Sequence, residues 1–143
     1  MERLKKAESY KDLQEGIRKL KIEPPLQAFE NKYQDKECMV QFHTEEFSAV
    51  CPRTGLPDYA EIYLRYIPNK KVLESKSCKL YLTAYRNIGI FHEHAINKIF
   101  EDFIKVVDPK EAYIRGEFNA RGGIDIVVER EYKKNINKKL DVE

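Results

Sequence analysis

Hydrophobic and polar residues alternate with a period of two in four stretches of the chain, two in each half. The first half has ECMVQFHTEEF, with a strand near residues 38–43, and YAEIYLRYI at 59–67. The second half has AYIRGEFN at 112–119 and, after a glycine pair, IDIVVEREY at 124–132. Such alternation is typical of strands with one buried face. We therefore expect two pairs of antiparallel strands.

The period changes to three and four between the two strand pairs, which predicts helices there. FHEHAINKIFEDFIKVVDP, residues 91–109, places apolar side chains at helical intervals, and the Asp-Pro pair at its end stops the pattern. ESKSCKLYLTAYRN, residues 74–87, is compatible with a helix capped by Ser75 or Ser77.

The order strand, strand, helix, helix, strand, strand indicates an α+β domain. It would contain one antiparallel sheet with both helices on one face. We expect this domain at residues 36–132, after an N-terminal arm or helix and connector at 1–35 that contains Pro24-Pro25, and before a polar tail at 133–143.

One sheet face and the sheet edges would be left uncovered in such a domain. Tyr59, Tyr63 and Tyr113 lie on the expected strands, and aromatic side chains suggest that the second face is not fully solvated. A multi-subunit assembly would explain both features.

Composition limits the function classes. The chain has 143 residues, 42% hydrophobic and 35% charged, with a net charge of +2. No apolar run approaches the length of about 20 residues that a membrane span needs. The N-terminus lacks the apolar core of a secretory signal, so we expect a cytoplasmic protein. The balanced charge argues against direct nucleic-acid binding as the main activity.

The three cysteines, Cys38, Cys51 and Cys78, have wide and irregular spacing. A disulfide framework and a zinc knuckle both fit this pattern poorly. Cys38 alternates with Val40 and Phe42, so we expect it to be a small buried residue of a strand.

CPRTGLPD, residues 51–58, is a short loop whose two prolines and glycine restrict it to a compact turn. Cys51 and Asp58, at its two ends, would then lie close together. A thiolate is a strong nucleophile, and a nearby carboxylic acid could protonate the group that it attacks. The alternative is that Asp58 only caps the turn.

His92 and Glu93 come at the start of the long expected helix. The carboxylate could accept hydrogen bonds from a purine-like base. Alternatively, Glu93 is a favourable first-turn residue and His92 a solvated neighbour. His92 and His94 are two residues apart and would point to different sides of a helix, and His43 is the only other histidine, so a metal site is not expected.

Lys76 and Lys79 are three residues apart, on one face of the shorter expected helix, with serines beside them. Ammonium and hydroxyl groups near a helix start can bind phosphate, and Arg121, next to a glycine pair, could add a guanidinium. The alternative is an ordinary solvated helix face. No GxGxxG follows a strand, so a nucleotide would bind outside a Rossmann frame.

Four motifs taken together, CPRTGLPD, ESKSCKLY, FHEH and RGG, resemble those of the 7-cyano-7-deazaguanine reductases, the QueF family, in their short single-module form. The resemblance covers residues 37–126, with the spacing between motifs intact. It implies the tunnelling fold (T-fold), in which ββααββ units assemble into barrels. It also implies NADPH-dependent reduction of a nitrile to a primary amine on the route to the queuosine base of transfer RNA.

The resemblance also implies roles for individual residues. Cys51 would be the nucleophile and Asp58 the general acid, with His92 beside them. The substrate-binding residues would be His92, Glu93, Leu73, Glu74 and Ser75. The cofactor-binding residues would be Lys76, Lys79, Arg121, Ser75 and Ser77.

Further expectations follow from the same resemblance: two NADPH per turnover, no metal, a 7-deazapurine nitrile as substrate, and a homo-oligomer. A decamer of two pentamers is expected, with sites between subunits. Cys78 departs from the family pattern, which carries a bulkier aliphatic residue there, and should face the core.

Three other functions remain open. A same-fold transferase uses the thioimide with ammonia or an amine to form an amidine, although it lacks residues of the ESKSCK type. A non-catalytic nucleotide- or RNA-binding module would use the basic residues without Cys51. A zinc-dependent pterin enzyme of this fold would need three well-placed histidines.

Overall fold

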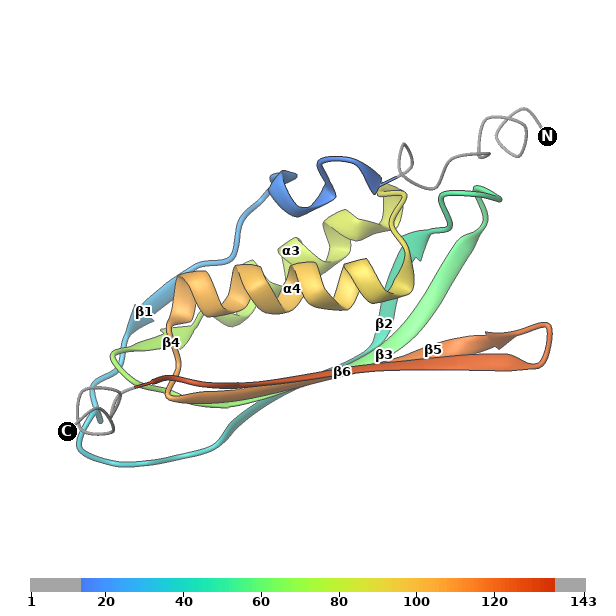
Figure 1. Cartoon of the computed structure of the whole chain (residues 1–143). Coiled ribbons are helices and arrows are strands. Elements are labelled where there is room, and N and C mark those ends of the chain that lie inside the picture. Colours follow the sequence, from blue (N-terminus) through green and yellow to red (C-terminus); the bar gives the residue numbers. More distant parts are fainter. Residues whose placement is uncertain (1–13, 136–143) are drawn as a thin grey trace.

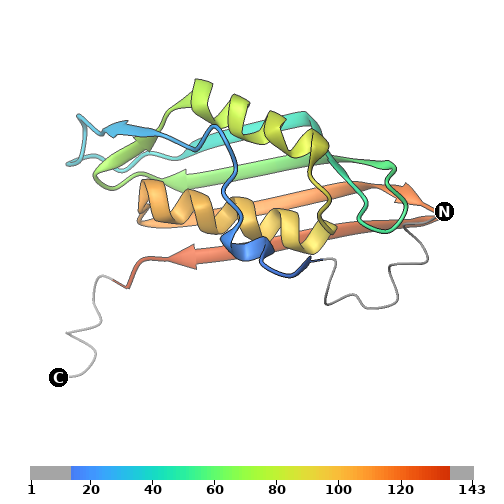
Figure 2. The same cartoon turned by 90° about the horizontal axis from the view of Figure 1, so that it is seen from above.

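A four-stranded antiparallel sheet with two α-helices on one face forms the body of the protein (Figure 1 and Figure 2). The computed structural model describes residues 14–135. The sheet has the order β2-β3-β5-β6 and consists of β2 (Val40–Val50), β3 (Pro57–Ile67), β5 (Glu111–Arg121) and β6 (Ile124–Lys133). The helices are α3 (Ser75–Thr83) and α4 (His92–Val107). The expected α+β order is thus confirmed.

Shorter elements lie around this body. Two of them, β1 (Ala28–Glu30) and β4 (Lys71–Leu73), pair as a second small antiparallel sheet that the hydrophobic pattern did not predict. The others are the 3-10 helices η1 (Ile17–Lys19) and η2 (Ala84–Asn87). No described helix has both the length and the apolar character to cross a membrane.

The core lies between the helices and the sheet face that they cover. Phe100 and Phe103 of α4 are fully buried and pack with residues of the sheet. Ile22 and Leu26, from the expected N-terminal arm, also belong to this core. The part of the arm that the structure describes therefore packs on the domain, whereas residues 1–13 and 136–143 lie outside the described range.

The start of α3 differs from the prediction. The helix begins at Ser75, but the carboxylate of Glu74 caps it by accepting hydrogen bonds from the backbone N–H groups of Lys76 (2.7 Å) and Ser77 (2.8 Å). These bonds hold the pKa of Glu74 below its usual value. The predicted serine cap was wrong because the preceding glutamate reaches both N–H groups.

Burial was predicted for two of the cysteines, and the prediction is confirmed for only one of them. Cys78 is buried in the core, as expected. Cys38 is exposed, and its predicted burial was wrong because β2 begins only at Val40.

The two ends of the sheet carry different motifs. β2 ends, β3 begins, β5 turns into β6 and α4 starts at the end nearer the described N-terminus (Figure 1). β4 and the start of α3 lie at the opposite end (Figure 1). The loop after β2 and the start of α3 are thus at opposite ends of the sheet within one chain.

Candidate active site

Cys51 follows β2 directly and opens the hairpin loop to β3. Its N–H donates to the carbonyl of Leu56 (2.8 Å), and its carbonyl accepts from the N–H of Gly55 (2.9 Å). Gly55 has φ 74°, in the left-handed region that glycine adopts without strain. The loop is therefore a closed turn, as its prolines and glycine predicted.

The strand register brings Asp58 near this turn. Asp58 pairs with Ala49, two residues before Cys51. Side chains two positions apart along one strand share a sheet face, so Cys51 and Asp58 occupy diagonal positions at the end of the hairpin. Cys51 is partly exposed and Asp58 is buried.

Asp58 is held by two basic side chains from elsewhere in the chain. Its Oδ2 lies 3.1 Å from Nε2 of His92, the first residue of α4. Its Oδ1 lies 3.7 Å from Nη2 of Arg121, at the end of β5. The motifs CPRTGLPD, FHEH and RGG thus converge on one carboxyl group.

Phe118 supports this cluster and was not predicted as a site residue. Its ring stacks on the imidazole of His92, with ring centroids 4.0 Å apart and an interplanar angle of 11°. Phe118 is only 3% exposed. It occupies an ordinary apolar strand position in AYIRGEFN, and the alternating pattern does not distinguish a side chain that packs on the core from one that packs on a site.

Glu93 is exposed on the first turn of α4, next to His92. Its backbone carbonyl accepts a hydrogen bond from the side chain of Asn97 (2.8 Å). The carboxylate is therefore accessible to a ligand at the same end of the sheet as Cys51.

Ser75, Lys76 and Lys79 are exposed on α3. Ser75 and Lys79 line a cavity of about 340 Å³ that also reaches residues of β2, including Thr44 and Glu46. The three exposed residues could contact an anionic ligand.

Leu73 and Ser77, also predicted as ligand-binding residues, are buried. The Ser77 hydroxyl accepts from the backbone N–H of Gln27 (2.9 Å) and donates to the carbonyl of Glu74 (2.8 Å). It therefore ties the N-terminal connector to the start of α3. Within one chain, the structure does not bring this motif to Cys51.

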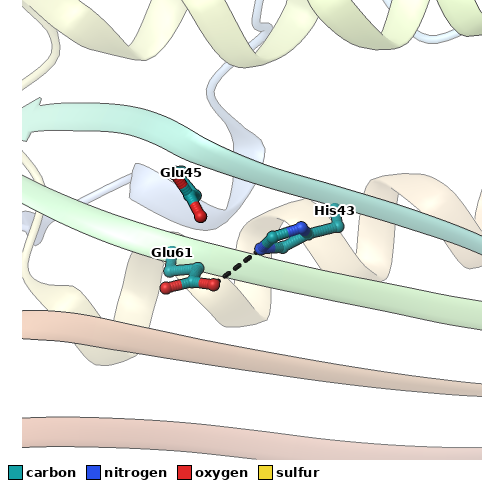
Figure 3. A group of neighbouring side chains, drawn as sticks. All are labelled: His43, Glu45 and Glu61. Atoms are coloured by element: carbon teal, nitrogen blue, oxygen red, sulfur yellow. Dashed lines mark hydrogen bonds and ion pairs between the residues drawn. The ribbon is translucent and has the colours of Figure 1, made fainter.

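A second titratable cluster lies on the uncovered face of the sheet (Figure 3). Ligand atoms of His43, Glu45 and Glu61 lie within 4.8 Å of one another, close enough to hold a cation. A register irregularity between Thr44 and Phe47 puts Glu45 beside the other two. The sequence reading missed this group because the bulge is not visible in the alternating pattern.

The charge of Glu61 in this cluster already has partners within the chain. Its Oε1 lies 2.7 Å from Nε2 of His43 and accepts a hydrogen bond from the hydroxyl of Tyr63. These bonds, from Tyr63 and then His43, lower the pKa of Glu61, and the bond to Glu61 raises the pKa of Tyr63 to about 12. The cluster faces away from Asp58, which contacts α4 on the other face of the sheet.

Comparisons with known proteins agree with the motifs. Residues 57–137 match the family model described as QueF-like protein. The NADPH-dependent 7-cyano-7-deazaguanine reductase of Caldicellulosiruptor bescii is 50% identical over 109 residues, which are 76% of this chain and 83% of the relative. The reductase of the same name from Syntrophus aciditrophicus is 48% identical over 117 residues, 82% of this chain and 84% of the relative.

A solved structure shares the fold. The archaeosine synthase QueF-Like in its apo form superimposes with a TM-score of 0.62 at 25% sequence identity, over 67% of this chain and 94% of that chain. The match supports the T-fold reading of the sheet and helix order. The family model and the reductases that are about half identical show that this chain belongs to the QueF family.

Proposed function

We propose that this chain is an NADPH-dependent 7-cyano-7-deazaguanine reductase, which converts the nitrile to the aminomethyl group on the route to queuosine. The observation that carries the proposal is the contact of Asp58 with His92 at the end of the hairpin whose loop begins with Cys51. It occurs in a chain half identical to curated reductases.

The first step makes the nitrile reducible. A nitrile resists direct hydride addition because negative charge would develop on its nitrogen. The sulfur of Cys51 forms a bond to the nitrile carbon, one π bond of the nitrile breaks, and Asp58 protonates the nitrogen. The product is a thioimide on Cys51, which accepts hydride more readily than the nitrile does.

The remaining steps reduce this adduct to the amine. NADPH supplies two hydrides in succession. After the first, collapse expels the Cys51 thiolate and releases an imine. The second hydride, together with a proton taken up from solvent, gives the amine. The reaction so written needs no metal, because nucleophile, acid and hydride donor account for every bond change.

Substrate recognition falls to the start of α4 and to the segment before α3. The exposed carboxylate of Glu93 would accept hydrogen bonds from the ring N–H and exocyclic amine of the base, and His92 would lie beside it. Leu73, Glu74 and Ser75 would form the opposite wall. Since the Glu74 carboxylate caps α3, it would act there by shaping the backbone.

Lys76, Lys79 and Ser75, all exposed on α3, would hold the cofactor phosphates. Ser77 would contribute indirectly, by fixing the start of the helix to the connector at Gln27. The start of α3 and the end of β2, which Cys51 follows, lie at opposite ends of the sheet (Figure 1). A complete site would therefore combine residues from two copies of the chain in a cytoplasmic homo-oligomer, which we expect to be a decamer of two pentamers.

The test is a stoichiometric assay with the nitrile base. Purified protein, nitrile and NADPH are mixed, and the cofactor oxidised is counted against the amine formed. We expect two NADPH per amine and complete loss of turnover in Cys51→Ala. Turnover that survives Cys51→Ala would overturn the proposal.

The amidine-forming transferase is the second candidate because the archaeosine synthase QueF-Like shares the fold. Its identity of 25%, against 50% for the reductase of C. bescii, favours reduction. Formation of an amidine from ammonia without NADPH would favour the transferase instead.

A further inference from the structure

Arg121 contacts Asp58, the proposed general acid, within its own chain. The family resemblance had instead grouped Arg121 with the cofactor-binding lysines Lys76 and Lys79. Its guanidinium lies at the same end of the sheet as Cys51 and Asp58, whereas Lys76 lies at the start of α3, at the other end (Figure 1). We infer that Arg121 is a positioning residue for Asp58, and that Arg121 mainly affects the rate of thioimide formation. This inference rests on the function proposed above.

The two oxygens of the Asp58 carboxylate have different partners. Oδ2 lies 3.1 Å from His92 Nε2 and Oδ1 lies 3.7 Å from Arg121 Nη2. A carboxylate held from both sides cannot rotate freely about its terminal bond. The stacked ring of Phe118 fixes the His92 side of this arrangement, and Arg121 fixes the other.

Strand pairing explains why Arg121 reaches this position. The pairing of β3 with β5 ends at Ala60 and Phe118, although β3 starts at Pro57 and β5 continues to Arg121. The pairing of β5 with β6 is irregular between Phe118 and Arg121, and such irregularities redirect side chains. The Arg121 Nη2 group then donates a hydrogen bond to the backbone carbonyl of Pro57. This residue lies beyond the last paired residues of β3 and β5.

The side chains of Asp58 and Arg121 differ in their exposure to solvent. The Asp58 side chain is 11% exposed and that of Arg121 is 47% exposed. Arg121 thus closes the solvent side of a buried acid. Its removal would leave Oδ1 without this partner and let the carboxyl group turn away from the nitrile nitrogen. Misplacing a catalytic group by about 1 Å can cost about 100-fold in rate.

The test separates adduct formation from cofactor binding, because thioimide formation uses no NADPH. Wild type and Arg121→Gln are mixed with the nitrile base alone, and the rate of the Cys51 adduct is followed by rapid quench and intact mass. We expect Arg121→Gln to form the adduct about tenfold more slowly or worse, with the KM for NADPH changed less than about twofold. Arg121→Lys keeps the charge but loses the planar fork, so it should recover only part of the rate.

Lys105→Gln is the control for loss of one positive charge, because Lys105 is exposed in the last turn of α4. It should form the adduct at the wild-type rate. Normal adduct formation in Arg121→Gln together with a raised KM for NADPH would overturn the inference and return Arg121 to the cofactor. Failure of the wild-type protein to form any adduct would instead overturn the proposed function.

Discussion

At the scale of single residues, the three thiols of the chain differ in burial, and we expect them to differ in reactivity for that reason. Cys38 is exposed and Cys51 partly exposed, whereas Cys78 on α3 is 6% exposed. Burial, and after it the charge of Glu74, raises the pKa of Cys78 to about 11. Since the thiolate is the reactive form, Cys78 should be inert at neutral pH.

Alkylation of the folded protein with iodoacetamide at pH 7, read by peptide mass spectrometry, should modify Cys38 and Cys51 and spare Cys78. The same reaction in concentrated urea should modify all three. Labelling of Cys78 as fast as Cys38 in the folded protein would contradict its placement in the core.

The compact turn between Cys51 and Asp58 is the part of the candidate site that the sequence predicted best. Cys51 and Asp58 flank a turn whose prolines and glycine already limit its size, so their proximity could be expected from the loop alone. The contacts of Asp58 with His92 and Arg121 depend on how α4 and β5 pack. No local pattern shows that packing, and the same holds for the stacking of Phe118.

At the scale of elements, the strongly periodic segments were predictable and the short ones were not. The period of α4 continues over sixteen residues, and the helix ends at Val107, before the Asp-Pro pair that was expected to stop it. β1 and β4 have three residues each, which is too short for a period to be recognised. Their pairing holds the connector against the start of α3, where Ser77 binds Gln27.

The contact of α4 with the sheet depends on Gly116 of β5. A Cβ atom at this position would lie 2.4 Å from Cδ1 and 2.7 Å from Cγ1 of Ile96, which is fully buried. Gly116→Ala should therefore destabilise the protein by about 1–3 kcal/mol through overpacking, measured as the free energy of unfolding in urea.

Two further variants make this prediction specific. Ile96→Ala should cost less in the Gly116→Ala background than in wild type, because it removes the atoms that clash. Gly89→Ala is the matched control: its Cβ would meet only Pro52 Cα at 3.9 Å, so a change within about 0.5 kcal/mol is expected. Equal costs for Ile96→Ala in both backgrounds would show that the two positions do not compete for space.

At the scale of the whole molecule, the uncovered sheet face carries a polar network. Arg115 binds Glu117 and Glu129, the hydroxyl of Tyr113 donates to Glu129, and Arg65 lies over the ring of Tyr113. Tyr63 and Tyr113 on this face therefore have partners within the chain, whereas Tyr59 is 49% exposed. The edges are different. The outer side of β6 has no strand partner in the described sheet, and the outer side of β2 is bonded at Val50 to the segment around Gly89. Such edges favour pairing with another copy where they are free.

The loop that begins with Cys51 and the start of α3 lie far apart within one chain. Mixing two inactive variants can therefore test whether each site is shared between two chains. If each site takes Cys51 from one chain and Lys79 from another, Cys51→Ala and Lys79→Ala proteins, each with little activity alone, should regain activity when co-refolded. A random equal mixture restores both residues in about a quarter of the sites. The measurement is nitrile-dependent NADPH oxidation, with each variant refolded alone as control and mixed oligomers verified by tagging one variant. A site built within one chain would give no recovery in such mixed oligomers, because every chain would lack one of its two required residues.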